Sequence, residues 1–324
     1  MKLILIKDNP MPAGGVVATI RAADGMALRV ARWHPQGESR GTVAICPGRA
    51  EFIEKYFETV GDLLARGLTV VVFDWRGQGF SGRQIANRWK GHIDDFSVYE
   101  RDLEALSAQV LEPFCPKPWF ALAHSMGGAI LIAQSRAGRS PFARIVTTAP
   151  MIDLYRLRLP RLARALAGTL DAVGLGGAFI PGGNARGSMS RSFDSNALTS
   201  DPARFQRLAD LRKAAPDLMI GDPTIGWITA AFRQMDAFAD GEYPRRVLTP
   251  MLVFSSGADR VVDSRAVERF AHRLKAGAVI ALPGARHEIL MERDAIRSQF
   301  WAAFDAFIPG SGVGAQPLAS SSSA

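Results

Sequence analysis

The sequence predicts an α/β fold, in which a mostly parallel central sheet is flanked by helices and carries a helical cap insertion. Short, near-continuous apolar runs alternate with amphipathic segments, a pattern typical of parallel strands that are covered on both faces. This alternation stops after Pro150 and resumes near Val247, and the interval shows helical periodicity without a convincing strand. The chain has 324 residues, 48% of them hydrophobic, which is enough to bury a large core.

The first expected element is a hairpin over residues 16–35 that turns at Asp24 and Gly25, because two β-rich runs flank that dipeptide. Residues 56–67 and 99–111 carry apolar residues three and four apart, as amphipathic helices do. Six apolar runs are the expected parallel strands, at 42–48, 68–77, 118–125, 143–150, 250–259 and 276–287.

These elements divide the chain into three parts. Residues 1–150 and 241–308 are predicted to form the α/β core, and residues 151–240 the helical cap. The remaining segment, 309–324, reads PGSGVGAQPLASSSSA and has no apolar periodicity. We expect this tail to be disordered.

Composition and charge exclude several classes of protein. The two cysteines, Cys46 and Cys115, lie far apart with no C-x-x-C, so neither a disulfide framework nor a zinc site is indicated. The N-terminus is too short in apolar residues for a signal peptide, and no run approaches the roughly 20 residues of a membrane span. We expect a cytoplasmic protein. The net charge of +8 favours anionic surfaces, but no nucleic-acid-binding motif accompanies it, so no nucleic-acid partner is expected.

A serine stands at a predicted strand-to-helix junction in the segment WFALAHSMGGAIL, residues 119–131. The strand ends at His124, and two glycines open the helix, which places Ser125 in a strained turn with an exposed hydroxyl. The nucleophile pattern G-x-S-x-G has glycine where this chain has Ala123, and we expect the additional methyl to be tolerated. On the motif alone, a packed turn around a small residue is the alternative.

Two further residues fit the partners that a nucleophilic serine needs. His287 lies in a loop directly after the last apolar strand, and Asp259 follows the strand before it. Asp263 competes for the acid role, but its position suits the cap of the following helix. His124 adjoins the serine and is expected to point to the opposite side of the turn. The order Ser125, Asp259, His287, each behind its own strand, predicts a serine, acid and histidine triad.

Acyl transfer also needs two donors for the developing oxyanion. The backbone N–H of Met126, directly after the serine, is the first candidate. The N–H of Arg49, in the loop after an earlier strand, is the second, and Gly48 before it allows a close approach. Contact between the Arg49 guanidinium and substrate, or simple solvation of that group, are alternative roles for this residue.

A dinucleotide fingerprint is the competing interpretation of another segment. Gly77, Gly79 and Gly82 have G-x-G-x-x-G spacing after a predicted strand. No amphipathic helix opens after them, and no second strand ends in an acidic residue at the required distance. We therefore expect a loop there and no nucleotide cofactor.

Taken together, these segments resemble the α/β-hydrolase superfamily, and within it the monoacylglycerol lipase and bacterial lysophospholipase group. The resemblance covers about residues 22–308 and rests on CPGRAEFIEKY, FDWRGQGFSGR, DDFSVYERDL, AHSMGGAI, SGADRVVD and GARHEILME. It implies Ser125 as nucleophile, Asp259 and His287 as its relay, and the N–H groups of Arg49 and Met126 as oxyanion donors. Pro47 stands where monoacylglycerol lipases typically have histidine, as in the lysophospholipase branch.

The expected function is hydrolysis of a single-chain lipid ester, a lysophospholipid or a monoacylglycerol, through an acyl-enzyme and without metal or cofactor. A short-chain or aryl esterase is the alternative enzyme, and a non-catalytic binding protein on the same scaffold is the alternative class. We expect Trp227 to shape the acyl site. The basic amphipathic stretch DLYRLRLPRLARAL, 153–166, suits contact with an anionic membrane at its inner face, with a solvated helix face as the alternative. The oligomeric state stays open.

Overall fold

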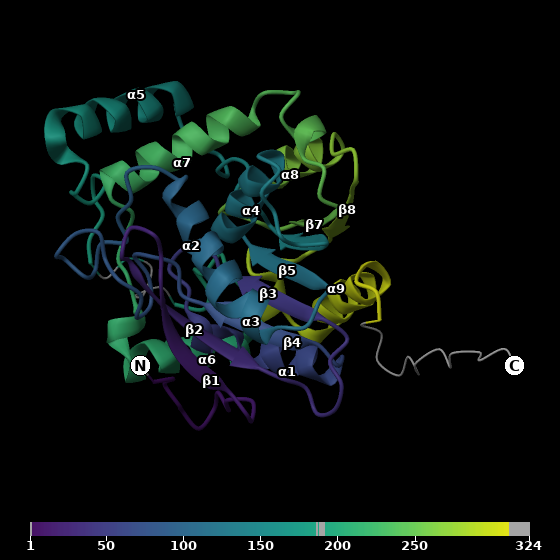
Figure 1. The fold of residues 1–324 in the computed structure, drawn as a ribbon. Helices are drawn as coiled ribbons and strands as arrows, with labels where there is room; N and C mark the ends of the chain where they lie inside the picture. The colour runs from purple at the N-terminus through teal and green to yellow at the C-terminus, as the bar shows by residue number, and fades with distance from the viewer. Residues whose placement is uncertain (1, 186, 188–191, 311–324) are drawn as a thin grey trace, which may run out of the picture.

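The central element of the computed structural model, which describes residues 2–185, 187 and 192–310, is an eight-stranded sheet in the order β1-β2-β4-β3-β5-β6-β7-β8 (Figure 1). β1 and β2 form the predicted antiparallel hairpin, and β2 is antiparallel to β4. All other pairs are parallel, which confirms a mostly parallel sheet. The strands are β1 (Val16–Arg21), β2 (Ala27–Trp33), β3 (Thr42–Cys46), β4 (Thr69–Phe73), β5 (Trp119–His124), β6 (Arg144–Thr148), β7 (Met251–Ser256) and β8 (Gly277–Leu282).

Helices cover both faces of this sheet, as near-continuous apolar strands require. The core helices are α1 (Phe57–Ala65), α2 (Val98–Leu106), α3 (Glu112–Phe114), α4 (Met126–Arg136), α8 (Ser264–Ala271) and α9 (Asp294–Phe307). The cap interval contributes α5 (Pro160–Leu170), α6 (Pro202–Ala214) and α7 (Ile225–Phe238). Short 3₁₀ and π segments are η1 (Ile53–Tyr56), η2 (Ser107–Leu111), η3 (Asp171–Leu175), η5 (Pro216–Leu218), η6 (Pro244–Arg246) and η7 (Ile289–Met291).

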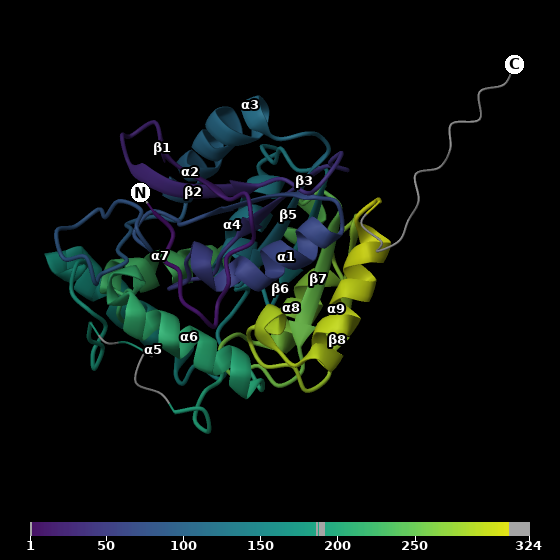
Figure 2. The same cartoon turned by 90° about the horizontal axis from the view of Figure 1, so that it is seen from below.

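The core is split by the sheet into two apolar layers. Phe57 and Val60 of α1 pack with Phe300 and Phe304 of α9 on one face, the face seen in Figure 2. Residues of α2, α4, α7 and α8 pack on the other face. Every residue of β3, β4, β5 and β7 is buried, because these strands have a helical layer on each side.

The interval between β6 and β7 is helical, but its helices do not form one bundle. α5 and α7 lie side by side over the sheet, whereas α6 lies apart from them (Figure 1). Arg204 and Arg207 of α6 both form ion pairs with Glu58 of α1, which ties α6 to the core. The domain boundaries at 151 and 241 stay a prediction, and residues 311–324 of the predicted tail lie outside the described residues.

Within residues 2–185, 187 and 192–310, no helix combines the length and the apolar composition that crossing a membrane requires.

Candidate active site

Ser125 lies in the one-residue turn between β5 and α4. Its backbone has φ 48° and ψ −111°, a conformation that costs a residue with a side chain on the order of 1–3 kcal/mol. The turn is fixed by hydrogen bonds from the N–H of Ser125 to the carbonyl of Thr148 (3.0 Å) and from the N–H of Met151 to the carbonyl of Ser125 (3.0 Å). The neighbouring strand end therefore supports the strained turn that the sequence predicts.

Gly127 and Ala123, the two small residues near Ser125, differ in whether a side chain fits at their positions. A Cβ at Gly127 would stand 2.2 Å from the carbonyl oxygen of Cys46 and 2.7 Å from that of Pro47, so only glycine fits there. Ala123 is fully buried in β5, beside Cys46 of β3 and Thr147 of β6, and its methyl is part of the apolar core. Glycine is thus required after the serine but not at position 123.

The structure brings together the three residues that the sequence predicts as a triad. His287 Nε2 lies 3.0 Å from Ser125 Oγ, and His287 Nδ1 lies 2.8 Å from Asp259 Oδ2. Because the carboxylate accepts, Nδ1 carries the proton and Nε2 is left to accept from the serine hydroxyl. Burial would raise the pKa of Asp259, but the hydrogen bonds from His287 and from the N–H groups of Val261 and Val262 lower it below its ordinary value.

Asp263, the competing acid, has the other role that its sequence position indicates. Its carboxylate accepts hydrogen bonds from the N–H groups of Arg265 (2.9 Å) and Ala266 (3.1 Å), so it caps α8. Asp263 therefore belongs to the helix and Asp259 to the site.

Of the two predicted oxyanion donors, Met126 directly follows Ser125, and Arg49 lines the same cavity as Ser125. Met126 is the first residue of α4, so its N–H has no partner in the helix. In the loop after β3, the N–H of Gly48 donates to Glu51 and that of Ala50 donates to Gln78. Among the described residues, no acceptor takes the N–H of Arg49 or Met126, which leaves both donors available.

A cluster of buried charges connects the loop after β3 to the loop that carries His287. The sequence patterns do not predict this cluster. The Lys55 ammonium pairs with Glu51 and with Glu288 Oε1 (2.6 Å), and Glu288 directly follows His287. Glu51 also accepts from the Tyr56 hydroxyl (2.5 Å). Burial would raise the pKa of Glu51, but Lys55 and the other donors lower it to about 2. Glu51 and Lys55 have helical i,i+4 spacing, but spacing alone does not reveal their burial.

The expected direction of the His124 side chain was wrong. Its ring centroid lies 4.7 Å from that of His287, and its Nε2 lies 3.8 Å from Glu51. Side chains alternate along a strand, but the positive φ of Ser125 ends the strand and breaks the alternation, so His124 lies at the site instead of across the turn. Burial lowers the pKa of His124 to about 4, although Glu51 opposes the shift.

A cavity of about 530 Å³ opens above the triad. Its wall contains Ser125, His287 and Arg49, and also Trp227 of α7, as predicted for an acyl site. Most of the other wall residues are apolar and come from both the core and the cap interval: Met151, Leu154, Ile180, Leu198, Leu208, Pro223, Ile228, Val261 and Val262. Such a wall suits a hydrocarbon chain.

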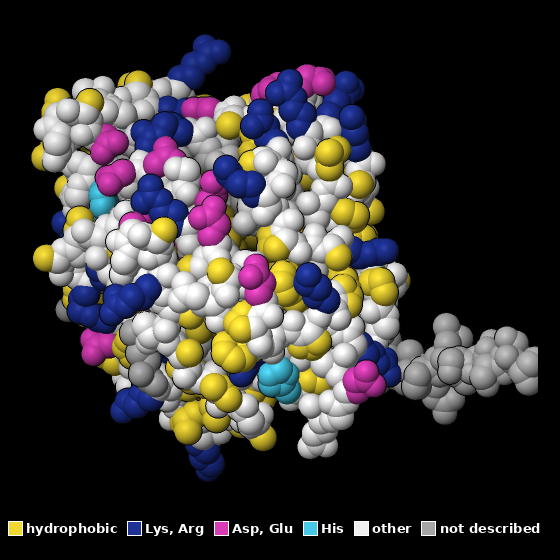
Figure 3. Space-filling view, in the orientation of Figure 1, with side chains coloured by type: hydrophobic (Ala, Val, Ile, Leu, Met, Phe, Trp, Pro, Cys, Tyr) yellow, Lys and Arg dark blue, Asp and Glu magenta, His cyan; other side chains and the backbone are white. Residues whose placement is uncertain are grey.

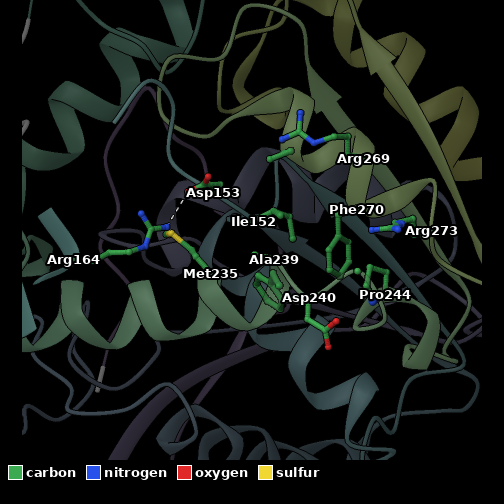
Figure 4. A pocket seen from close by; sticks show the side chains of 13 residues that line it. Ile152, Asp153, Arg164, Met235, Ala239, Asp240, Pro244, Arg269, Phe270 and Arg273 are labelled. Atoms are coloured by element: carbon green, nitrogen blue, oxygen red, sulfur yellow. Dashed lines mark hydrogen bonds and ion pairs between the residues drawn. The ribbon is translucent and has the colours of Figure 1, made fainter. Parts of the chain in front are cut away.

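A second cavity, of about 260 Å³, lies between α7 and α8 (Figure 4). Its wall includes Met235 and Phe270, with Arg164, Arg269 and Arg273 around them. No member of the triad lines this cavity.

The glycine-rich segment after β4 is a loop, as expected. Gly77 and Gly79 have φ of 81° and 50°, and the chain there wraps the buried carboxylate of Asp74, which accepts from the N–H groups of Ile53 and Phe80. No helix begins between this loop and Val98, and all residues of that stretch are described. The segment therefore lacks the helix on which a dinucleotide phosphate would bind.

A mostly parallel sheet with serine at the turn after β5, an acid after β7 and histidine after β8 defines an α/β-hydrolase. The chain belongs to the Hydrolase_4 family, described as serine aminopeptidase S33, whose model matches residues 37–294. It is 34% identical over 296 residues to lysophospholipase L2 of Escherichia coli K12, covering 87% of this chain and 84% of that protein. It is 26% identical over 265 residues to a monoacylglycerol lipase of Mycolicibacterium smegmatis, covering 80% of this chain and 85% of that protein.

Solved structures show the same fold. A soluble variant of monoglyceride lipase from Saccharomyces cerevisiae superposes with a TM-score of 0.73 at 18% identity, covering 92% of this chain and 97% of that one. A thermostable carboxyl esterase from Bacillus coagulans gives a TM-score of 0.71 at 18% identity, covering 92% and 99%. The chain is thus an ester hydrolase of the lysophospholipase and monoacylglycerol lipase group.

Proposed function

We propose that this protein hydrolyses the carboxylic ester of a single-chain lipid, a lysophospholipid or a monoacylglycerol, through an acyl-enzyme on Ser125. The observation that carries the proposal is the hydrogen-bonded chain from Ser125 through His287 to Asp259 beneath an apolar cavity of about 530 Å³. The names of the relatives from Escherichia coli and Mycolicibacterium smegmatis support the two substrate classes.

In the first half-reaction, His287 takes the hydroxyl proton of Ser125 as Oγ attacks the acyl carbon. The oxyanion that forms accepts hydrogen bonds from the N–H groups of Met126 and Arg49. The intermediate then breaks its bond to the leaving alcohol, and His287 donates the proton to that oxygen. Asp259 keeps the imidazole oriented and stabilises its charged form.

In the second half-reaction, His287 accepts a proton from water, and the hydroxide attacks the acyl carbon of the ester on Ser125. The same two N–H groups hold the second oxyanion. The bond between the acyl carbon and Oγ breaks, and His287 returns the proton to Ser125. The products are a fatty acid and an alcohol.

Labelling with a fluorophosphonate tests the nucleophile. The wild-type protein is expected to be labelled and to hydrolyse long-chain p-nitrophenyl esters, and Ser125→Ala is expected to lose both properties. Labelling that persists in Ser125→Ala would show that another residue is the nucleophile. A wild type that is not labelled would favour a non-catalytic role.

Acyl-chain length tests the lipid part of the proposal. Because the cavity wall is mainly apolar, kcat/KM should rise from acetyl to long-chain p-nitrophenyl esters. A preference for acetyl or butyryl esters would identify a short-chain esterase instead.

We also propose that the protein contacts an anionic membrane through α5 and the residues flanking it. Leu159, Leu162 and Leu166 lie three and four residues apart and are 69%, 61% and 50% exposed, so this side of α5 does not cover the core. Figure 3 shows hydrophobic side chains at the edge of the molecule formed by α5. Arg158 and Arg161, beside them in the sequence, supply the positive charge that anionic lipid attracts.

A further inference from the structure

Arg212, near the C-terminal end of α6, is a cation in the wall of the active-site cavity. Among the residues that the structure describes, no acceptor takes its buried Nε, and its guanidinium forms no ion pair. By contrast, Arg204 and Arg207 on the same helix are paired with Glu58. A desolvated guanidinium without a partner is unfavourable, which makes Arg212 unlike the structural arginines of α6 and typical of a ligand-binding group.

Arg212 shares the cavity wall with His287 and with the two acids Glu51 and Glu288. Burial lowers the pKa of Arg212, and the negative charges of Glu288 and Glu51 oppose that shift. Both acids are already engaged by Lys55, and Glu288 directly follows His287. Arg212 therefore faces the same cavity as His287, the residue that donates the proton to the leaving alcohol in the proposed reaction.

A second guanidinium adds positive charge to the same wall. Arg49 lies over the ring of Trp227, at 4.9 Å from the ring centroid, and donates to the carbonyl of Gly221 (3.0 Å). Its Nε is also buried without an acceptor among the described residues. Neither arginine is needed to accommodate a hydrocarbon chain.

The two substrate classes differ in the charge of the leaving alcohol. A lysophospholipid releases a glycerol that carries an anionic phosphodiester a few bonds from the leaving oxygen, whereas a monoacylglycerol releases neutral glycerol. A guanidinium in the wall of the cavity can donate two hydrogen bonds to such a phosphate.

We propose that Arg212 binds the head-group phosphate of a lysophospholipid, and that Arg49 adds to the positive potential at that position. The inference rests on the proposed function and narrows its substrate to lysophospholipids in preference to monoacylglycerols.

The test compares Arg212→Gln with the wild type on lysophosphatidylethanolamine and monoacylglycerol of the same acyl chain, both in neutral detergent micelles. The ratio of kcat/KM for the lysophospholipid to kcat/KM for the monoacylglycerol should fall about tenfold or more, which corresponds to loss of one charge-assisted contact. Arg212→Lys should restore part of the ratio. Lys213→Gln is the matched control, because Lys213 is the adjacent, exposed cation of α6 and its removal should leave the ratio unchanged.

Three results would overturn the inference. An unchanged ratio in Arg212→Gln would show that Arg212 does not bind the head group. An equal loss on both substrates would show that Arg212 only supports the fold. A wild type that hydrolyses neither lipid would refute the proposed function itself. Glycerophosphoethanolamine should inhibit the wild type more strongly than Arg212→Gln. If inorganic phosphate inhibits equally well, the site takes free phosphate and not a head group.

Discussion

The residues next to Ser125 differ in how much space a side chain has. The serine itself adopts φ 48°, and Gly127 passes so close to the end of β3 that any side chain would meet backbone atoms there. Backbone atoms of a central strand cannot move without breaking the sheet. Ala123, by contrast, occupies space in the core that its methyl fills.

This difference predicts opposite outcomes for two small substitutions. Gly127→Ala should lower the free energy of unfolding by about 3 kcal/mol or more and reduce turnover strongly, because the new methyl overlaps the carbonyl of Cys46. Ala123→Gly should cost only about 1–2 kcal/mol and keep kcat within about threefold. Urea denaturation and steady-state hydrolysis of a p-nitrophenyl ester measure both quantities. Collapse of turnover in Ala123→Gly would contradict this account of the packing.

The positions of the three residues of the proposed triad could be predicted from sequence, but the side chains around them could not. Ser125, Asp259 and His287 each follow an apolar strand, and the carboxyl ends of parallel strands meet at one edge of the sheet. The direction of the His124 side chain depends on the φ of Ser125, and the sequence pattern does not reveal that angle. The contact of Lys55 with Glu288 joins η1 to the loop after β8, which is far away in the chain, so the burial of these two charges became apparent only in the folded structure.

At the scale of elements, periodicity identified the strands and the helical character of the cap, but not how the cap helices are placed. Apolar runs of the right length predict strands wherever both faces are covered, and all six parallel strands lie within the predicted runs. The position of α6 depends on contacts that are distant in the chain. Arg204 and Arg207 pair with Glu58, about 150 residues earlier, and Leu208 and Leu211 share an apolar cluster with Phe52. Such long-range pairs leave no local signal.

The exposed leucines of α5 predict binding to lipid. Replacing Leu162 and Leu166 with serine should weaken binding to anionic vesicles about tenfold or more, because each buries apolar surface in the interface. Vesicle flotation with phosphatidylglycerol-containing liposomes measures the bound fraction. Leu248→Ser is the matched control, since Leu248 is 65% exposed and lies outside α5. Equal binding by the double variant and the wild type would show that α5 is a solvated face.

For the whole molecule, buried ionisable groups connect distant parts of the chain. Arg29 of β2 pairs with Glu54 of η1 and Asp74 after β4, with all three side chains fully buried. A charge buried in such a cluster is stable only while its partner keeps the opposite charge. The free energy of unfolding must therefore depend on pH through groups whose protonation differs between the folded and unfolded chain.

His124 makes the free energy of unfolding depend on pH between about 4 and about 6.5. Its pKa is lowered by burial to about 4 in the folded protein, while an unfolded histidine titrates near about 6.5. Between these values the unfolded chain binds a proton that the folded chain does not, so stability is present in full above about pH 6.5 and is lost as the pH falls toward 4. Across this pH range the free energy of unfolding falls by about 3 kcal/mol.

Urea denaturation at several pH values across that window tests the effect. His124→Asn keeps a side-chain N–H donor for Thr148, to which His124 Nδ1 lies 3.1 Å away, but removes the titrating ring. We expect its free energy of unfolding to fall less steeply with decreasing pH than that of the wild type. His272→Asn, at an exposed position on the end of α8, should keep the wild-type slope. If His124→Asn and the wild type lose stability in parallel, the acid sensitivity arises from the carboxylates of the ion-pair clusters and not from His124.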